Sequence, residues 1–222
     1  MADRNYQLFY PLLYLVTDRD LALGRPLLEV VAQAVEGGVN IVQIREKALD
    51  TRAFIEEARQ IQAYLKPKGI PLLINDRVDV ALAIGADGVH IGQSDMPYPL
   101  ARKLLGPKAL IGLSIDTQEE LRQAESYDVD YLGIGPVFPT STKTDHKEFF
   151  WGIEGLRWAR SNSRHRLIAI GGINETNASD VAKTGVDGIA VVSAIVSAQD
   201  PREAARRLRA ALEQETSRQV PL

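Results

Sequence analysis

The sequence contains no cysteine, and this absence excludes several kinds of chemistry at once. The protein can form no disulfide, offers no thiolate nucleophile and cannot build a zinc site on sulfur ligands. Histidine adds no alternative, because His146 and His165 have no partner at a metal-ligand spacing. His90 lies inside an apolar run, and we interpret it as a core residue. We therefore predict no zinc site.

Long apolar runs and a strong excess of one charge are also missing. No run approaches the roughly 18 apolar residues that a membrane span needs, and the first residues lack the apolar segment of a signal peptide. Lys plus Arg number 26 against 29 Asp plus Glu, for a formal net charge of -3. Nothing therefore draws the whole chain to nucleic acid or to an anionic membrane. We expect a cytoplasmic enzyme or binding protein that meets any anion with local residues.

Short apolar runs alternate with amphipathic stretches along the chain, a pattern typical of βα units around a parallel sheet. The alternation predicts eight strands, at residues 12–16, 40–45, 71–74, 88–91, 110–113, 131–134, 167–170 and 188–192. It predicts helices that include residues 26–36, 51–65, 117–125 and 201–213. Three strand approaches, "GADGVHIG", "YDVDYLGIG" and "GVDGIAVVS", each carry an acidic residue just before the apolar run. These similarities are consistent with a repeated unit.

Eight units in 222 residues leave roughly 28 residues for each, which suits a compact (β/α)₈ TIM barrel. A doubly wound open sheet is the competing fold. We rank it second because the chain has no GxGxxG motif and because its polar candidates follow many strands instead of one switch point. No Pro-, Gly- or Ser-rich linker interrupts the sequence, so we expect one domain over residues 1–222, with a loose tail at 217–222.

The motif "QIREK" ends the second predicted strand. Side chains alternate along a strand, so Gln43 and Arg45 share one face, with Lys47 continuing the period, while Val42 and Ile44 share the other. In a barrel the polar set would line the upper interior and the apolar pair would meet the helices. A solvated, charged strand end is the alternative, and for this motif alone it is slightly favoured.

Carboxylates follow two neighbouring strands. "LINDRVD" places Asn75 and Asp76 after the third strand, and "GVHIGQSD" places Asp95 after the fourth. Asn or Asp at such a position most often caps the next helix. Adjacent strand ends would, however, bring Asp76 and Asp95 within reach of one cation, and two carboxylates with room for water and substrate oxygens suit Mg²⁺.

The stretch "GPVFPTSTK" follows the sixth strand. Pro136 and Pro139 restrict the loop, its hydroxyl side chains at 140–142 offer donors, and Lys143 adds a charge suited to phosphate. We favour phosphate binding over a Ser/Thr-rich surface loop. Ser114 ends the fifth strand without a surrounding Gly-x-Ser-x-Gly, so we assign it to binding and not to nucleophilic attack.

The last two strands end in "AIGGIN" and "AVVSAI". The glycine pair allows a close backbone approach, Asn174 to Asn177 can start a helix, and loops after strands 7 and 8 of such barrels commonly bind phosphate. Either glycine could instead serve only a tight turn. A strongly charged anion site and a nearly neutral one thus share the same opening of the barrel. The charged site suggests a pyrophosphate ligand, and the nearly neutral site suggests a monophosphate. Two phosphate sites imply two substrates and therefore group transfer.

These motifs together resemble those of the thiamine phosphate synthase family, over nearly the whole chain. The segments are "QIREK", "NDRVDVALAIGADGVHIGQSD", "GPVFPTSTK", "GGI" and "VVSAI". The resemblance implies a barrel enzyme, a transferase of thiamine biosynthesis that joins hydroxymethylpyrimidine pyrophosphate to thiazole phosphate and releases pyrophosphate with the help of Mg²⁺. It further implies a dissociative mechanism, in which pyrophosphate leaves first and the thiazole nitrogen captures a pyrimidine cation.

The resemblance also implies roles for individual residues. The pyrimidine pyrophosphate would contact Gln43, Ile44, Arg45, Glu46, Lys47, Asn75, Ser114 and Lys143, of which Arg45, Lys47, Ser114 and Lys143 would be catalytic. The thiazole phosphate would contact Thr140, Ser141, Thr142, Gly172, Val192 and Ser193, and Mg²⁺ would bind Asp76 and Asp95. The expected partners are small phosphorylated molecules and a possible second copy of the chain, with no nucleic acid or membrane. The segment "HKEFFWG", residues 146–152, is more aromatic than expected for the family.

Two other functions stay open at this point. A thiazole tautomerase-like isomerase would share the barrel but use one phosphate site, so it should not need both the cationic set and the two aspartates. A non-catalytic phosphoester-binding regulator, or a protein that engages a partner through the basic segment "RWARSNSRHR", belongs to a different class. That segment fits a solvated helix end more simply and contains no nucleic-acid motif.

Overall fold

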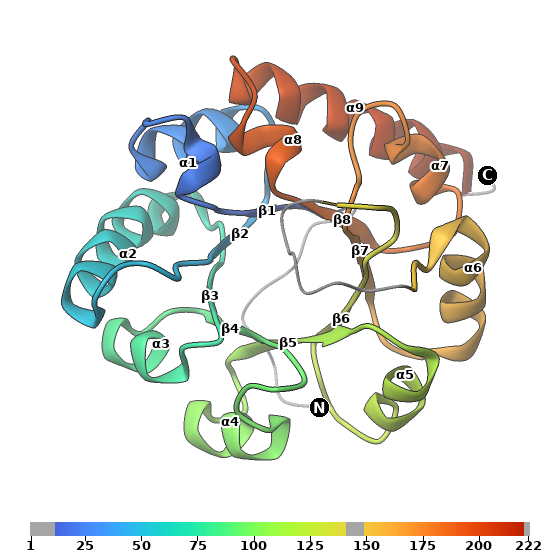
Figure 1. Ribbon diagram of the computed structural model, residues 1–222, viewed down its shortest axis with the longest axis horizontal. Helices are drawn as coiled ribbons and strands as arrows, with labels where there is room; N and C mark the ends of the chain where they lie inside the picture. Colours follow the sequence, from blue (N-terminus) through green and yellow to red (C-terminus); the bar gives the residue numbers. More distant parts are fainter. Residues whose placement is uncertain (1–11, 141–148, 220–222) are drawn as a thin grey trace.

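The computed structural model describes residues 12–140 and 149–219, with side chains through Gln214 in the last helix. Eight parallel strands follow one another around a closed barrel in chain order, and helices surround it (Figure 1). The strands are β1 (Leu12–Val16), β2 (Ile41–Ile44), β3 (Leu72–Asn75), β4 (Gly88–Ile91), β5 (Leu110–Ile115), β6 (Tyr131–Ile134), β7 (Leu167–Ile170) and β8 (Gly188–Val191). The predicted TIM barrel is confirmed, and each strand lies within two residues of its predicted bounds.

The helices of the outer ring are α1 (Leu27–Glu36), α2 (Thr51–Leu65), α3 (Val78–Ile84), α4 (Tyr98–Leu105), α5 (Gln118–Ala124), α6 (Gly152–Asn162), α7 (Ala178–Ala182), α8 (Ser193–Val196) and α9 (Pro201–Gln219). Two short 3₁₀ turns complete the order: η1 (Asp20–Ala22) lies between β1 and α1, and η2 (Lys66–Lys68) lies between α2 and β3. Helix α9 runs further than predicted and includes residues 217–219 of the expected tail. Its sequence has no glycine or proline between Arg202 and Val220 to end it earlier.

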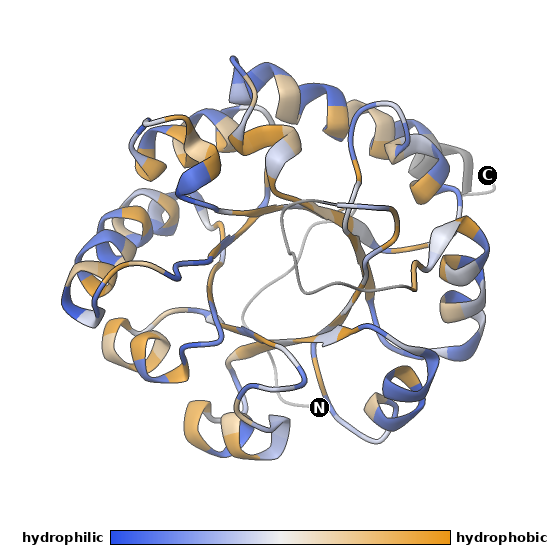
Figure 2. Ribbon diagram, viewed as in Figure 1, coloured by the Kyte–Doolittle hydropathy of each residue, from blue (hydrophilic) through white to orange (hydrophobic). Residues whose placement is uncertain are grey.

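Two separate apolar layers explain why the strands are apolar on both faces. Outward-facing residues such as Val42 and Ile44 pack with the helices in one large core. Inward-facing residues, including Leu12, Ile41 and Ile168, form a second core inside the barrel. Figure 2 shows the result as a largely hydrophobic ring of strands inside helices whose hydrophilic residues lie mainly toward the outside. The strand alternation predicted for Val42 and Ile44 is therefore confirmed.

The acidic residue that precedes three of the strands has a structural role. Asp87 accepts a hydrogen bond from the backbone N–H of Leu72 (2.7 Å), Asp130 from that of Ile111 (2.8 Å) and Asp187 from that of Leu167 (2.8 Å). Each carboxylate thus holds the start of the strand before its own. Because these bonds lie at the amino ends of the strands, they leave the carboxyl ends to other residues.

Candidate active site

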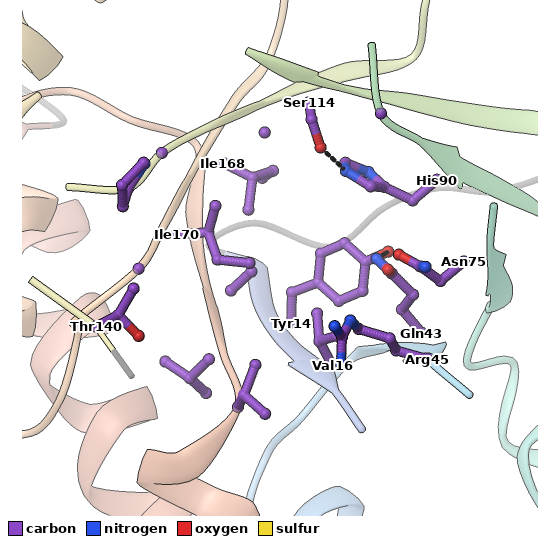
Figure 3. Close-up of a pocket in the computed structure, with 18 of the residues that line it drawn as sticks. Tyr14, Val16, Gln43, Arg45, Asn75, His90, Ser114, Thr140, Ile168 and Ile170 are labelled. Atoms are coloured by element: carbon purple, nitrogen blue, oxygen red, sulfur yellow. Dashed lines mark hydrogen bonds between the residues drawn. The ribbon is translucent and has the colours of Figure 1, made fainter. Parts of the chain in front are cut away.

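A cavity of about 1440 Å³ opens at the carboxyl ends of the strands. Eleven of the sequence-predicted site residues line it: Gln43, Arg45, Lys47, Asn75, Asp76, Asp95, Ser114, Thr140, Gly172, Val192 and Ser193. Figure 3 shows Ile168 and Ile170 on one side of this cavity and Gln43, Asn75 and His90 on the other. The remaining predicted loop residues, Ser141, Thr142 and Lys143, lie outside the described residues.

Two cationic side chains follow β2. Arg45 donates from Nη1 to Asp18 Oδ2 (3.0 Å), and the Nζ of Lys47 donates to Asp76 Oδ2 (2.6 Å). The backbone N–H of Arg45 is held by the hydroxyl of the buried Thr17 (3.1 Å). The Lys47 side chain remains 58% exposed, so its charge is available to a ligand that enters the cavity.

Ile44 and Glu46, two of the predicted substrate contacts, are not among the residues that line the cavity. Ile44 is fully buried among the helix-facing residues, as strand alternation requires. The Glu46 side chain is 2% exposed and accepts from the N–H groups of Ala48 and Leu49 and from Arg19 Nε. Burial alone would raise the pKa of Glu46, but these three hydrogen bonds outweigh it and lower the pKa. Glu46 therefore shapes the loop that carries its two cationic neighbours.

Two carboxylates lie together at the ends of β3 and β4. Asp76 adopts a left-handed backbone conformation (φ +61°), which is unfavourable for a residue with a side chain, and its N–H bonds to His90 O (2.9 Å). Asp95 Oδ2 accepts from Gly92 N–H (2.7 Å). Burial and the neighbouring Asp76 carboxylate raise the pKa of Asp95, while Lys47 acts in the opposite direction.

Such a pair has the chemistry of a divalent-cation site. A cation between Asp76 and Asp95 would relieve the repulsion that raises the Asp95 pKa. No group of three or more His, Asp or Glu residues suited to a metal occurs within 12–140 and 149–219. The chain would therefore supply two carboxylates and leave the other positions to water and substrate oxygens, as Mg²⁺ prefers. The residues present fit Mg²⁺.

The cavity floor contains polar residues that the sequence reasoning missed. His90 is not an ordinary core histidine: it lines the cavity and bonds through Nδ1 to the Tyr131 hydroxyl (2.9 Å). Its Nε2 bonds to Ser114 Oγ (2.8 Å), as Figure 3 shows. Tyr14 and Tyr131 line it as well, as does Phe150 near the mouth. The signal for His90 was present, because the alternation in "GVHI" sends Val89 outward and therefore His90 inward.

Loops after β6, β7 and β8 form the opposite side. Val137 N–H donates to Ile170 O (2.9 Å) and Phe138 N–H to Gly171 O (3.0 Å), which ties two loops together. Val192 O accepts from the N–H groups of residues 195 and 196, so the N–H groups of Ser193 and Ala194 precede the first bonded turn of α8. Among the described residues that line the cavity, neutral donors therefore dominate this side.

Residues 13–195 match the family model described as thiamine monophosphate synthase. The chain belongs to this family. It is 55% identical to the thiamine-phosphate synthase of Albidiferax ferrireducens, over 89% of this chain and 90% of that one. The enzyme of Vibrio campbellii is 53% identical over 88% and 95%. The solved thiamine phosphate pyrophosphorylase from Pyrococcus furiosus superposes with a TM-score of 0.83 at 42% identity, covering 92% of this chain and 96% of that chain.

Membership of the thiamine monophosphate synthase family confirms the resemblance predicted from the motifs and makes this chain an enzyme, a transferase. The basic segment at 157–166 offers no support for a partner-binding protein. Arg160 pairs with Asp187 (3.1 Å), and Arg164 donates to the carbonyls of Glu125 and Tyr127. None of the helices in the described part of the chain combines the length and apolar character of a membrane span.

Proposed function

We propose that this enzyme condenses hydroxymethylpyrimidine pyrophosphate with thiazole phosphate to give thiamine phosphate and pyrophosphate. One observation carries the proposal: a single cavity has two chemically unlike sides. The side after β2 to β4 presents Arg45, Lys47 and the aspartate pair, while the side after β6 to β8 presents neutral hydroxyl and N–H donors. Two phosphorylated substrates of different charge fit these two sides.

The charged side suits a departing diphosphate. When the bond between the pyrimidine methylene carbon and the diphosphate oxygen breaks, its electron pair goes to that oxygen. The diphosphate that Arg45 and Lys47 contact then becomes more negative. A hydrogen bond to a charged group is worth roughly 1.5–3 kcal/mol. Lys143 would add a further cation. Because these bonds strengthen as charge develops, they would lower the barrier to departure.

The second step needs no proton transfer. The lone pair of the thiazole nitrogen forms the new C–N bond with the pyrimidine cation, and the positive charge passes to that nitrogen. The neutral side, with Thr140, Gly172, Val192 and Ser193, would hold the thiazole phosphate, with Ser141 and Thr142 contributing from the same loop. This scheme asks for orientation and exclusion of water, and not for a general base.

Asp76 and Asp95 would hold Mg²⁺ for this reaction. A bound Mg²⁺ would supply positive charge beside the diphosphate and so favour its departure. The chain's own residues prepare the position: Lys47 pairs with Asp76, and Gly92 N–H orients Asp95. A thiazole tautomerase-like isomerase, with one phosphate site, would not need the set of Arg45, Lys47, Asp76, Asp95 and Lys143.

The proposal is tested by incubating the full-length protein with both substrates and MgCl₂ and detecting thiamine phosphate by mass spectrometry. Isomerised thiazole phosphate without thiamine phosphate would support the isomerase instead. The variant Asp95→Asn should lose at least about tenfold in Mg²⁺-dependent turnover, since one ligand and its charge are removed. Its affinity for thiazole phosphate, measured by calorimetry, should be unchanged.

Asp79→Asn is the matched control, because this carboxylate lies on α3, pairs with Arg77 and is 62% exposed outside the cavity. Its turnover should equal that of the wild type. Full Mg²⁺-dependent turnover in Asp95→Asn would remove the metal assignment while leaving the condensation itself standing.

A further inference from the structure

A continuous chain of hydrogen bonds crosses the interior of the barrel beneath the proposed substrates. Gln43 Nε2 donates to the Tyr14 hydroxyl (2.8 Å), which bonds to the Tyr131 hydroxyl (2.9 Å). The Tyr131 hydroxyl bonds to His90 Nδ1 (2.9 Å), and His90 Nε2 bonds to Ser114 Oγ (2.8 Å). Five strands, β2, β1, β6, β4 and β5, contribute one residue each. The proposed reaction assigns substrate contacts to Gln43 and Ser114, the two ends of this hydrogen-bond network. It assigns no role to the three residues between them.

Close packing holds the middle of the chain in place. Tyr14 and Tyr131 are each 1% exposed, with ring centroids 5.8 Å apart in an edge-on arrangement. A Cβ at Gly112 would lie 2.0 Å from Tyr131 Cζ, and one at Gly133 would lie 3.0 Å from His90 Cε1. Two positions therefore lack side chains where the Tyr131 and His90 rings need the space. A side chain at either glycine would displace the ring beside it.

The donor and acceptor of each hydrogen bond in this network can be assigned. Burial raises the pKa of Tyr14 and of Tyr131, so both phenols stay protonated and each donates one hydrogen bond. Gln43 donates to Tyr14, so the Tyr14 proton goes to Tyr131 and the Tyr131 proton goes to His90. Nδ1 of His90 is then an acceptor, and the neutral ring carries its proton on Nε2, facing Ser114.

We propose that Tyr14, Tyr131 and His90 form a positioning relay that fixes the polarity of Gln43 and Ser114 toward the cavity. With its amide nitrogen committed to Tyr14, Gln43 presents its carbonyl oxygen as an acceptor. With Oγ accepting from His90, Ser114 presents its own proton as a donor. Tyr14 and Tyr131 are buried and His90 is half-buried, and in this proposal the three residues act through the two ends.

The relay deepens the proposed function and rests on it, because it specifies which heterocyclic ring of the substrate the cavity binds. An aromatic heterocycle with an exocyclic amine and a ring nitrogen, such as an aminopyrimidine, offers one N–H donor and one lone pair. The amine matches the Gln43 carbonyl, and the ring nitrogen matches the Ser114 hydroxyl. Since the ends are linked, reversing one reverses the other, so a single hydroxyl in the middle governs the recognition of both groups.

The test is Tyr131→Phe, which removes the middle hydroxyl and keeps the ring that fills the space beside Gly112. We expect kcat/KM for the pyrimidine substrate to fall about tenfold, the equivalent of one ordered hydrogen bond, with KM for thiazole phosphate within about twofold of wild type. Tyr64→Phe is the matched control, because its hydroxyl contacts Ala32 O (3.4 Å) in the helical layer outside the cavity. A loss in Tyr131→Phe no larger than in this control would overturn the relay.

Two further measurements separate the relay from a merely structural role. With a pyrimidine substrate that lacks the amine, the wild type should lose activity strongly, whereas Tyr131→Phe should discriminate between the two substrates about fivefold less. Equal discrimination in both proteins would refute the relay. Nitrogen-15 NMR of the free protein, with the His90 signals assigned by their absence in His90→Gln, should show a proton on Nε2 and none on Nδ1, and a mixture of tautomers in Tyr131→Phe.

The NMR result is independent of turnover. If the wild type forms no thiamine phosphate, the proposed function fails, and the tautomer of His90 still decides whether the relay has the stated polarity. A proton on Nδ1 in the wild type, or a tautomer that is unaffected by Tyr131→Phe, would overturn the inference even in a fully active enzyme.

Discussion

Gly172 provides a quantitative test of the side of the cavity assigned to thiazole phosphate. This residue lies where the loops after β6 and β7 touch, and its φ of +68° is in the left-handed region. A Cβ there would lie 2.7 Å from both Phe138 Cβ and Pro139 O, and 2.9 Å from Phe138 O. Because two of these atoms belong to the backbone, no side-chain rotation can relieve the contact. Gly172→Ala must therefore push the two loops apart.

A second glycine separates the two contributions to the loss of stability in Gly172→Ala, which are backbone conformation and overpacking. Alanine in the left-handed region costs roughly 1–2 kcal/mol, and overpacking typically adds about 1–3 kcal/mol. Gly69 has nearly the same φ, +67°, but a Cβ there would meet nothing within 4 Å. Gly69→Ala should therefore lower the free energy of unfolding by the first amount alone. The difference between the two variants, roughly 1–3 kcal/mol, measures the contact between the loops.

Denaturant unfolding of both variants gives this difference, and steady-state kinetics give its functional consequence. We expect Gly172→Ala to raise KM for thiazole phosphate about tenfold or more, because a shift of the loops misplaces donors that bind the phosphate. KM for the pyrimidine substrate should rise less, since Arg45 and Lys47 are untouched and, of its proposed cationic contacts, only Lys143 belongs to the loop after β6. Equal unfolding free energies in the two variants, together with an unchanged KM for thiazole phosphate, would refute the reasoning.

Two further predictions concern residues outside the proposed substrate contacts. Glu46→Gln should lower the free energy of unfolding by about 1–3 kcal/mol and raise KM for the pyrimidine substrate. The reason is that an amide cannot accept from both Arg19 and the Ala48 and Leu49 N–H groups. Glu57→Gln, which changes only the other carboxylate paired with Arg19, should leave KM unchanged in the same assay. Burial lowers the pKa of His165, whose side chain is 7% exposed. Below about pH 6.5, His165 is therefore protonated more in the unfolded protein than in the folded protein. Stability should therefore fall as the pH drops below that value, by at most about 1.4 kcal/mol per pH unit from this group, and unfolding curves of His165→Gln should show a smaller loss.

The barrel itself was predictable from local patterns. Each strand is a short apolar run, and polar residues follow several of them, as Arg45 follows β2 and Asp76 follows β3. Neighbouring parallel strands necessarily end on the same side of the sheet. That is why Arg45, Asp76 and Asp95 could be expected to lie together although about 50 residues separate the first from the last. The same alternation also located the helix-facing Val42 and Ile44.

Contacts across the barrel interior were not predictable in the same way. The alternation could have turned His90 inward, but its partners Tyr131 and Ser114 follow from how the sheet closes and how far each strand is displaced along its neighbour. Glu46 shows a related limit. It sits in a charged motif, yet its fully enclosed carboxylate serves the loop, because the backbone turns after β2 and brings the Ala48 and Leu49 N–H groups back to it. Such a turn leaves no periodic signal in the sequence.

The two ends of the barrel divide stability from chemistry. At the amino ends, Asp87, Asp130 and Asp187 each hold the backbone of a neighbouring strand, and two of them are also paired with arginine. At the carboxyl ends, Asp76 is held at a positive φ, which few residues other than glycine adopt, beside a second carboxylate. Strain and repulsion of this kind persist only where the surrounding structure imposes them. The acidic residues at one end therefore stabilise the scaffold. Those at the other end are held by that scaffold, by Lys47 and by the Gly92 N–H in a position that a bound cation would favour further.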